Sequence, residues 1–148
     1  MINSRFTVGV HLLALLALGG ERCPGVPLTS EIASESVNTN PVVVRRILGC
    51  LRKAGMVSSQ SGPNGGWCLR REPTAITLQE VYRAVEDDTL FSMHHSPPSS
   101  DCLIGRNIQD ALSYFFGQAE AAMEAKLADQ TVADVVAAVL DRAAAQAS

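Results

Sequence analysis

The chain has 148 residues, of which 47% are hydrophobic and 18% charged, and its formal net charge is −3. This composition excludes an intrinsically disordered chain, and the length favours one domain with a single core. The charge is unevenly distributed, because residues 36–71 carry six basic side chains and no acidic one. A local basic face can bind phosphates on an acidic protein, although a solvated surface has the same composition. The net charge therefore does not exclude a nucleic-acid partner.

The first helix is predicted from Ser4, which can cap it, to about Leu18, where Gly19-Gly20 would end it. The apolar run within this helix is also the pattern of a signal peptide. However, His11 interrupts the run, a single arginine precedes it, and it is too short to span a membrane. We therefore expect a buried helix and no membrane partner.

A short second helix is predicted to begin at Thr29 or Ser30, either of which can cap it. Glu31 lies in its first turn, and Ile32-Ala33 is expected to face inward. Residues 36–39 then form a polar connection.

The third helix is predicted over residues 41–54. Asn40 can cap its free amides, Pro41 is pre-organised for the first helical position, and Gly55 is a natural end. Apolar residues at i, i+3, i+4 and i+7 are expected to face the core, namely Val44, Ile47, Leu48 and Leu51. The other face presents two basic pairs seven residues apart, Arg45-Arg46 and Arg52-Lys53.

Two short strands are predicted after the third helix, over residues 56–60 and 67–70. Asn64-Gly65 between them is the positive-φ pair that a tight hairpin needs. Trp67 and Leu69 of the second strand are expected to pack on the helices. A short helix, a turn, a basic helix and a hairpin are the order of a winged helix-turn-helix. In that fold the third helix enters the major groove, and the hairpin reaches phosphates or the minor groove.

A fourth helix is predicted from Leu78 to about Glu86. Thr77 and Glu80 form a capping box at its start, where Ile76 and Val81 form a hydrophobic staple. A loop rich in Ser and Pro follows it. Residues 1–86 are thus predicted to form a winged helix-turn-helix domain, followed by a loop over residues 87–102.

Residues 103–148 are predicted to form a helical dimerisation region. Its long amphipathic helix runs from Leu103 to about Leu127, and Thr131 with Asp134 caps a last helix. Because so small a domain has little core left to cover the apolar stripe of the long helix, we expect a second copy to cover it. Such a dimer would set two recognition helices about one turn of DNA apart. The expected dimer contacts are Ile104, Ile108, Leu112, Phe115 and Met123.

The segments LTSEIASESVNTNPVVVRRILGCLRKAGMVSSQSGPNGGWCLRR and TAITLQEVYRAVE carry a family resemblance. They resemble the bacterial iron–sulphur-cluster-regulator and nitric-oxide-sensitive-repressor family (the Rrf-two type), which also includes a cysteine-metabolism repressor. The resemblance covers residues 3–86 and, in outline, the rest of the chain. It implies a dimeric DNA-binding transcription regulator that reads bases near Asn40, Val43 and Arg45.

Two residues depart from the pattern of that family. Ser61 stands where many members carry a wing arginine, which predicts a weaker grip on phosphates. Arg45 stands where cluster-binding members often have Glu, so the operator need not be the one that those members bind. Together the pattern and the resemblance predict these DNA contacts: Ser30, Thr39, Asn40, Pro41, Val43, Arg45, Arg46, Arg52, Lys53, Asn64 and Gly65.

The number and positions of the cysteines indicate whether the protein could sense a signal through an iron–sulphur cluster or through a thiol. Cluster-binding relatives carry three cysteines just before the long helix, whereas that loop here offers Cys102, with His94 and His95 nearby. One thiolate cannot hold a two-iron cluster, so we expect no metal and no cofactor. A redox switch would instead use Cys50 or Cys102, although Cys50 also suits a small core residue. The wide cysteine spacing is typical of neither a disulfide scaffold nor a zinc finger and favours a reducing cytoplasm.

We therefore expect a mainly α protein with a small two-stranded β wing, acting without catalysis as a homodimeric, cytoplasmic repressor on double-stranded DNA. Whether a redox signal or a small molecule controls it stays open. One alternative of another class remains, a helical metal- or thiol-responsive interaction module that does not act on DNA. Salt-dependent binding to duplex DNA distinguishes the two.

Overall fold

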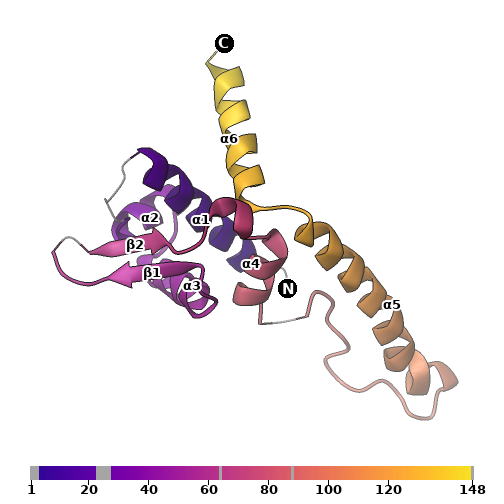
Figure 1. The fold of residues 1–148 in the computed structure, drawn as a ribbon. Helices are drawn as coiled ribbons and strands as arrows, with labels where there is room; N and C mark the ends of the chain where they lie inside the picture. Colours follow the sequence, from indigo (N-terminus) through magenta and orange to yellow (C-terminus); the bar gives the residue numbers. More distant parts are fainter. Residues whose placement is uncertain (1–3, 23–27, 64, 88, 148) are drawn as a thin grey trace.

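The computed structural model describes residues 4–22, 28–63, 65–87 and 89–147 (Figure 1). Most of these residues are helical, and the described strands form one two-stranded antiparallel sheet. Among the described helices, none combines the length and the hydropathy that a membrane crossing requires. The elements in chain order are α1 (Arg5–Arg22), α2 (Ser30–Val37), α3 (Pro41–Lys53), β1 (Val57–Gln60), β2 (Gly66–Leu69), the short 3₁₀ helix η1 (Pro73–Ala75), α4 (Leu78–Val85), α5 (Leu103–Ala128) and α6 (Val132–Gln146).

Helix α1 supplies the centre of the core, as expected for a buried helix. Leu12 and Leu13 are fully buried in one cluster with apolar residues of α2, α3, α4 and the start of α6. The predicted end at Gly19-Gly20 is wrong, because α1 continues to Arg22. A glycine inside a helix costs only about 1 kcal/mol relative to alanine, which does not end a helix whose earlier turns are held by a core.

Helix α2 begins at the predicted cap. The Thr29 Oγ1 accepts a hydrogen bond from the Ile32 amide at 3.2 Å. Ala33 is buried as predicted, but Ile32 is 54% exposed, so the prediction that Ile32 faces inward is wrong. Ser34 takes the second inward position, because a rotation of about 100° per residue places it beside Ala33. The connection to α3 is also shorter than predicted, since α2 runs to Val37.

The predicted caps and the predicted buried face of helix α3 are confirmed. The Asn40 Oδ1 accepts a hydrogen bond from the Val42 amide at 2.8 Å, and Pro41 occupies the first turn. Gly55 follows the end of the helix with a φ of +77°, a conformation that favours glycine. The four predicted core residues, Val44, Ile47, Leu48 and Leu51, are all buried.

Strands β1 and β2 form the predicted hairpin, paired from Val57 with Leu69 to Gln60 with Gly66. Trp67 and Leu69 pack against the core, as expected. At Gly65 a Cβ atom would lie 2.3 Å from the carbonyl oxygen of Gln60, so this glycine is required by close approach of the backbone. The predicted positive-φ pair includes Asn64, which lies outside the described residues.

Helices α4 and α6 begin side by side. Both predicted capping boxes are present, Thr77 with Glu80 and Thr131 with Asp134. The Leu78 amide donates to the Gln130 carbonyl, and the Val132 amide donates to the Ile76 carbonyl, each at 2.9 Å. Fully buried Val132 thereby anchors α6 in the core beside α1.

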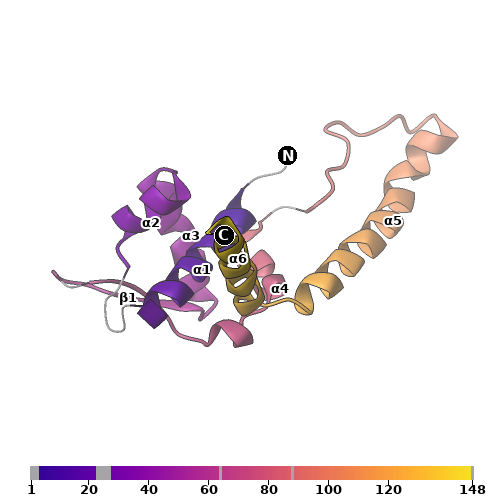
Figure 2. The same cartoon turned by 90° about the horizontal axis from the view of Figure 1, so that it is seen from above.

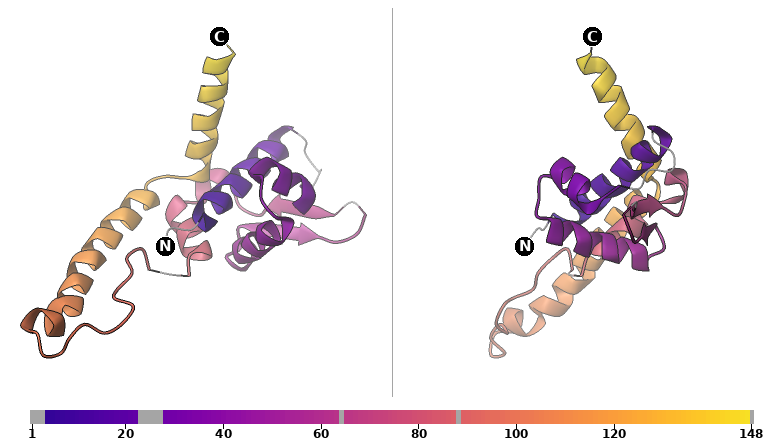
Figure 3. Two further views of the ribbon diagram at one scale, coloured as in Figure 1. Left: turned by 180° about the vertical axis from the view of Figure 1, so that it is seen from behind. Right: turned by 90° about the vertical axis from the view of Figure 1, so that its left-hand side faces the viewer.

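Helix α5 spans the predicted range but lies differently from α6. It reaches away from the body of the molecule, while the wing projects on the opposite side (Figures 1 and 2). The view from behind shows the same separation (Figure 3). None of the described side chains of α5 is buried. The division of the chain into residues 1–86, 87–102 and 103–148 stays a prediction.

Candidate nucleic-acid interface

The outward face of α3 carries the basic residues that the sequence singled out. Arg45, Arg46, Arg52 and Lys53 are all exposed. In the described part of the chain, none of these four side chains forms an ion pair, whereas three arginines outside α3 pair with carboxylates. The positive charge of α3 is thus available to an external anion.

The first turn of α3 lies beside this charge. Val42 and Val43 are 51% and 38% exposed, and Asn40 at the helix start is exposed as well. Apolar side chains of this size can contact the thymine methyl group in the major groove, and a side-chain amide can bond the edge of adenine. Of the other predicted contacts near this turn, Thr39 and Pro41 are half-buried.

The wing is linked to α3 through Trp67. The Arg52 guanidinium lies 5.8 Å from the centroid of the Trp67 ring, and its Nη1 donates to the Ser59 Oγ at 3.4 Å. The Trp67 backbone also forms a bridge with Leu28, just before α2. These contacts hold the wing and α3 in one unit.

The same tryptophan bonds one of the predicted DNA-contacting residues. The Trp67 Nε1 donates to the Ser30 Oγ at 3.2 Å, so that oxygen already has a partner within the protein. Sequence reasoning interpreted Trp67 as packing alone and missed both its polar contact and its cation–π contact. The sequence did hold a signal for the cation–π contact, because the one tryptophan of the chain lies in a segment with six basic residues. Of the predicted wing contacts, Gly65 lies in the hairpin loop, and Asn64 is not among the described residues.

The two candidate sensing cysteines lie on different elements. Cys50 is half-buried on α3, where the Arg5 Nη2 donates to its Sγ at 3.7 Å. Cys102 is exposed at the N-cap of α5, where the nearby backbone amides of Gly105 and then Ile104 lower the pKa of its thiol. A lowered thiol pKa raises the fraction of reactive thiolate.

The predicted dimer residues lie along α5. Ile104 and Phe115 are 68% and 62% exposed, and Ile108, Leu112 and Met123 are half-buried. The exposed large apolar residues of α5 also include Leu103 and Tyr114. Exposed apolar residues that gather along one helix are typical of interaction sites.

Comparison with known proteins places this architecture in a family. The model of the Rrf2 family, described as iron-dependent transcriptional regulator, matches residues 2–138. YwnA of Bacillus subtilis strain 168, whose name describes an HTH-type transcriptional regulator, is 42% identical over 137 residues, which are 92% of this chain and 97% of YwnA.

Solved structures agree on the fold. A crystal structure described as that of a DNA-binding protein is 39% identical, has a TM-score of 0.69, and is matched over 89% of this chain and 98% of its own. The IscR protein of T. potens is 21% identical, with a TM-score of 0.68 over 94% of this chain and 88% of its own. At that identity the likeness shows the fold alone.

The family description names iron, which requires side chains that can bind it. An iron–sulphur cluster is held by about four protein ligands, mostly thiolates. In the residues that the structure describes, no three His, Cys, Asp or Glu side chains come together as a metal site. Cys102 lies before α5, Cys50 on α3 and Cys68 in the wing, so the described donors do not fit a cluster.

Three findings therefore agree: a helix-turn-helix with a basic third helix and a wing, a family model that spans most of the chain, and a full-length relative at 42% identity. The chain belongs to the Rrf2 family of transcriptional regulators.

Proposed function

We propose that this regulator represses transcription as a cytoplasmic homodimer that places α3 of each subunit in the major groove of duplex DNA. The observation that carries the proposal is the exposed face of α3, where four basic side chains lie without an ion pair in the described part of the chain. Such a face binds phosphates and reads base edges from one helix.

Within this face the residues have different roles. Asn40 caps α3, and Val43 and Arg45 lie in its first half, the part of a recognition helix that contacts base edges. Arg46, Arg52 and Lys53 are assigned to the phosphates on either side of the groove. The Arg52 contacts with Trp67 and Ser59 fix the angle between helix and wing, so both reach one stretch of DNA.

Dimerisation is assigned to α5. Its apolar residues are exposed in the single chain, and pairing with a second copy would remove them from water. A twofold axis along α5 would present two α3 helices to successive major grooves, and the operator would then be a palindrome.

Selection from random duplex DNA tests the proposal. The purified full chain should enrich sites with two inverted half-sites separated by about one helical turn. A promoter carrying the enriched site should then be repressed in cells that express the protein. Failure to enrich any sequence would contradict sequence-specific binding, and enrichment of single half-sites would contradict the dimer.

A further inference from the structure

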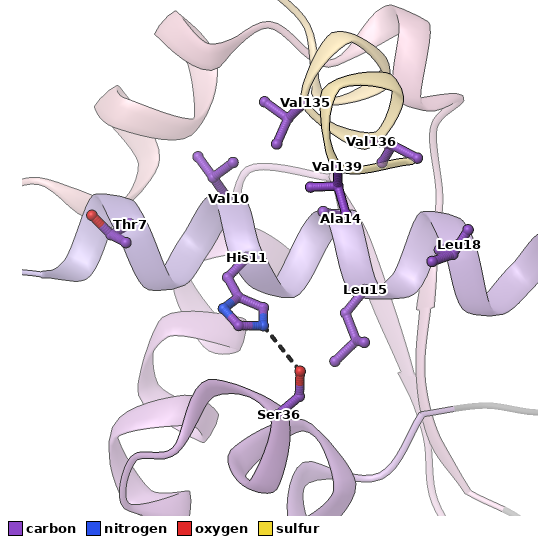
Figure 4. Close-up of a pocket in the computed structure, with 10 residues that line it drawn as sticks. All are labelled: Thr7, Val10, His11, Ala14, Leu15, Leu18, Ser36, Val135, Val136 and Val139. Atoms are coloured by element: carbon purple, nitrogen blue, oxygen red, sulfur yellow. Dashed lines mark hydrogen bonds between the residues drawn. The ribbon is translucent and has the colours of Figure 1, made fainter. Parts of the chain in front are cut away.

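A hollow of about 490 Å³ lies on one face of α1, outside the candidate nucleic-acid interface (Figure 4). Helix α1 forms its floor, three valines of α6 stand on one side, and the last turn of α2 stands on the other. All three elements belong to one chain. The lining residues are Thr7, Val10, His11, Ala14, Leu15, Leu18, Ser36, Val135, Val136 and Val139.

The lining is apolar apart from three side chains, Thr7, His11 and Ser36. The His11 Nε2 lies 3.0 Å from the Ser36 Oγ, so the two polar groups meet at one side of the hollow. An apolar cavity of roughly 300–1,000 Å³ with a few convergent polar groups is the usual form of a small-molecule site.

We propose that this hollow binds a small, mostly apolar molecule that carries one hydrogen-bonding group. The apolar body lies between Val10 and Ala14 of α1 and Val139 of α6, and its polar group bonds to His11 or Ser36. A comparison of the hollow with the apolar side of α5 supports a small molecule as the occupant of the hollow. The exposed apolar residues of α5 lie along a single helix and suit a second helix, whereas the hollow is lined from three elements and joins apolar walls to a pair of polar side chains.

The position of the hollow connects it to DNA binding. Ser36 lies in the last turn of α2, and Asn38 in the left-handed conformation, with a φ of 59°, starts the turn that leads into α3. A ligand that bonds to the His11–Ser36 pair therefore acts on the turn that orients the recognition helix. This regulatory consequence rests on the proposed function, whereas the binding of the ligand does not.

The neutral dye prodan is a suitable probe, because it has an apolar naphthalene body and one carbonyl acceptor and its emission shifts to the blue in apolar surroundings. We expect one dye per chain to bind the wild-type protein with such a shift. Ala14→Phe and Val139→Phe each place a ring in the hollow and should weaken binding about tenfold or more. His11→Leu should weaken it about fivefold, since one hydrogen bond is lost.

Two controls match these variants. Ala137→Phe makes the same substitution at an exposed position of α6 outside the hollow, and His95→Leu removes an exposed loop histidine; both should bind the dye like the wild type. Val139 is 51% exposed, so its variant keeps the fold even if Ala14→Phe does not. Absence of a bound dye on the wild type, or dye binding by Ala14→Phe and Val139→Phe that equals binding by the wild type, would overturn the site. A dimer that excludes the dye and dissociates on Val139→Phe would show that a second copy fills the hollow.

The effect on DNA is measured separately, with the sequence enriched from random duplexes. Saturating prodan should change the affinity of the wild type for that DNA and leave the affinity of Val139→Phe unchanged. Dye binding with no change in DNA affinity would overturn the regulatory consequence and keep the site. If no DNA is bound at all, the proposed function fails, while dye binding still decides the proposal for the hollow.

Discussion

Helices α1–α4 and the long helix α5 both carry periodic apolar residues, but these residues are buried in α1–α4 and exposed on α5. Leu12, Ile47 and Leu48 are at most 2% exposed in a core shared by several elements, whereas Leu103 and Ile104 of α5 are more than two-thirds exposed. The same kind of periodic pattern therefore makes a core in one place and a bare surface in another. Periodicity tells which side of a helix is apolar, and only the surrounding chain tells what covers that side.

Helix α5 is held to the rest of the chain through its middle and second half. Arg83 of α4 pairs with Glu124 at 2.6 Å, the Leu90 amide donates to Glu120 at 3.1 Å, and Phe91 stacks on Phe116 with ring centroids 4.5 Å apart. The first turns of α5 carry its most exposed apolar residues. The core supports the stability of the fold, α5 carries the proposed association, and substitutions on each test the two roles separately.

The largest effect is expected on association. Ile108→Asp would place a charge in a dry interface between two α5 helices, which should weaken the dimer by about 3–5 kcal/mol. Ser113→Asp, on the same helix at an exposed polar position, should leave the dimer intact. Sedimentation at several protein concentrations measures both. A wild-type chain that is monomeric at micromolar concentration would break the assignment of α5.

The next effect is expected on stability. Leu48→Ala opens a cavity in the core and should lower the free energy of unfolding by about 2–5 kcal/mol. Leu103→Ala makes the same substitution at a residue that is 69% exposed and should change that free energy by less than about 0.5 kcal/mol. Chemical denaturation of both variants tests the contrast. Equal losses would mean that α5 belongs to the same core.

A smaller effect is expected on base reading. Arg45→Ala should cost about 1–3 kcal/mol of DNA affinity and relax the preference at one base position in each half-site. Arg142→Ala removes an arginine from α6, on another element, and should bind like the wild type. Repeating the selection from random duplexes with each variant measures the preference. An unchanged preference for the Arg45 variant would remove this residue from the base-reading set.

The smallest effect concerns pH. The Thr77 amide, and then Arg71, hold the pKa of Glu80 below its ordinary value of 4.5, so the ionised carboxylate stabilises the fold. This contribution is complete above the ordinary pKa and is lost as the pH falls through the lowered pKa of the folded state. The wild type should therefore lose more stability than Glu80→Gln between neutral pH and about pH 3, in thermal unfolding. Glu72→Gln, an exposed neighbour, should behave like the wild type, and an identical loss in all three proteins would contradict the role of Glu80.

The features that the sequence predicts well are local ones. The Asn40 cap and the Thr77–Glu80 box each join residues within three positions, and the buried face of α3 repeats within two turns. Features that depend on distant residues were missed. Gly19-Gly20 does not end α1, Ile32 faces outward, and Trp67 donates to a hydroxyl 37 residues away. The hollow on α1 was missed for the same reason, since it exists only where α2 and α6 meet one helix.

The central claim is that the exposed basic face of α3 binds DNA, and the salt dependence of DNA affinity tests it most directly. Each phosphate contact contributes about −0.9 to the slope of log affinity against log salt, because condensed counterions are released. The wild type should show a steep negative slope, and Arg46→Ala and Lys53→Ala should each flatten it by about one contact and weaken all sequences alike. Arg142→Ala should keep the wild-type slope. Slopes that are equal in all four proteins would show that α3 does not carry the DNA contact.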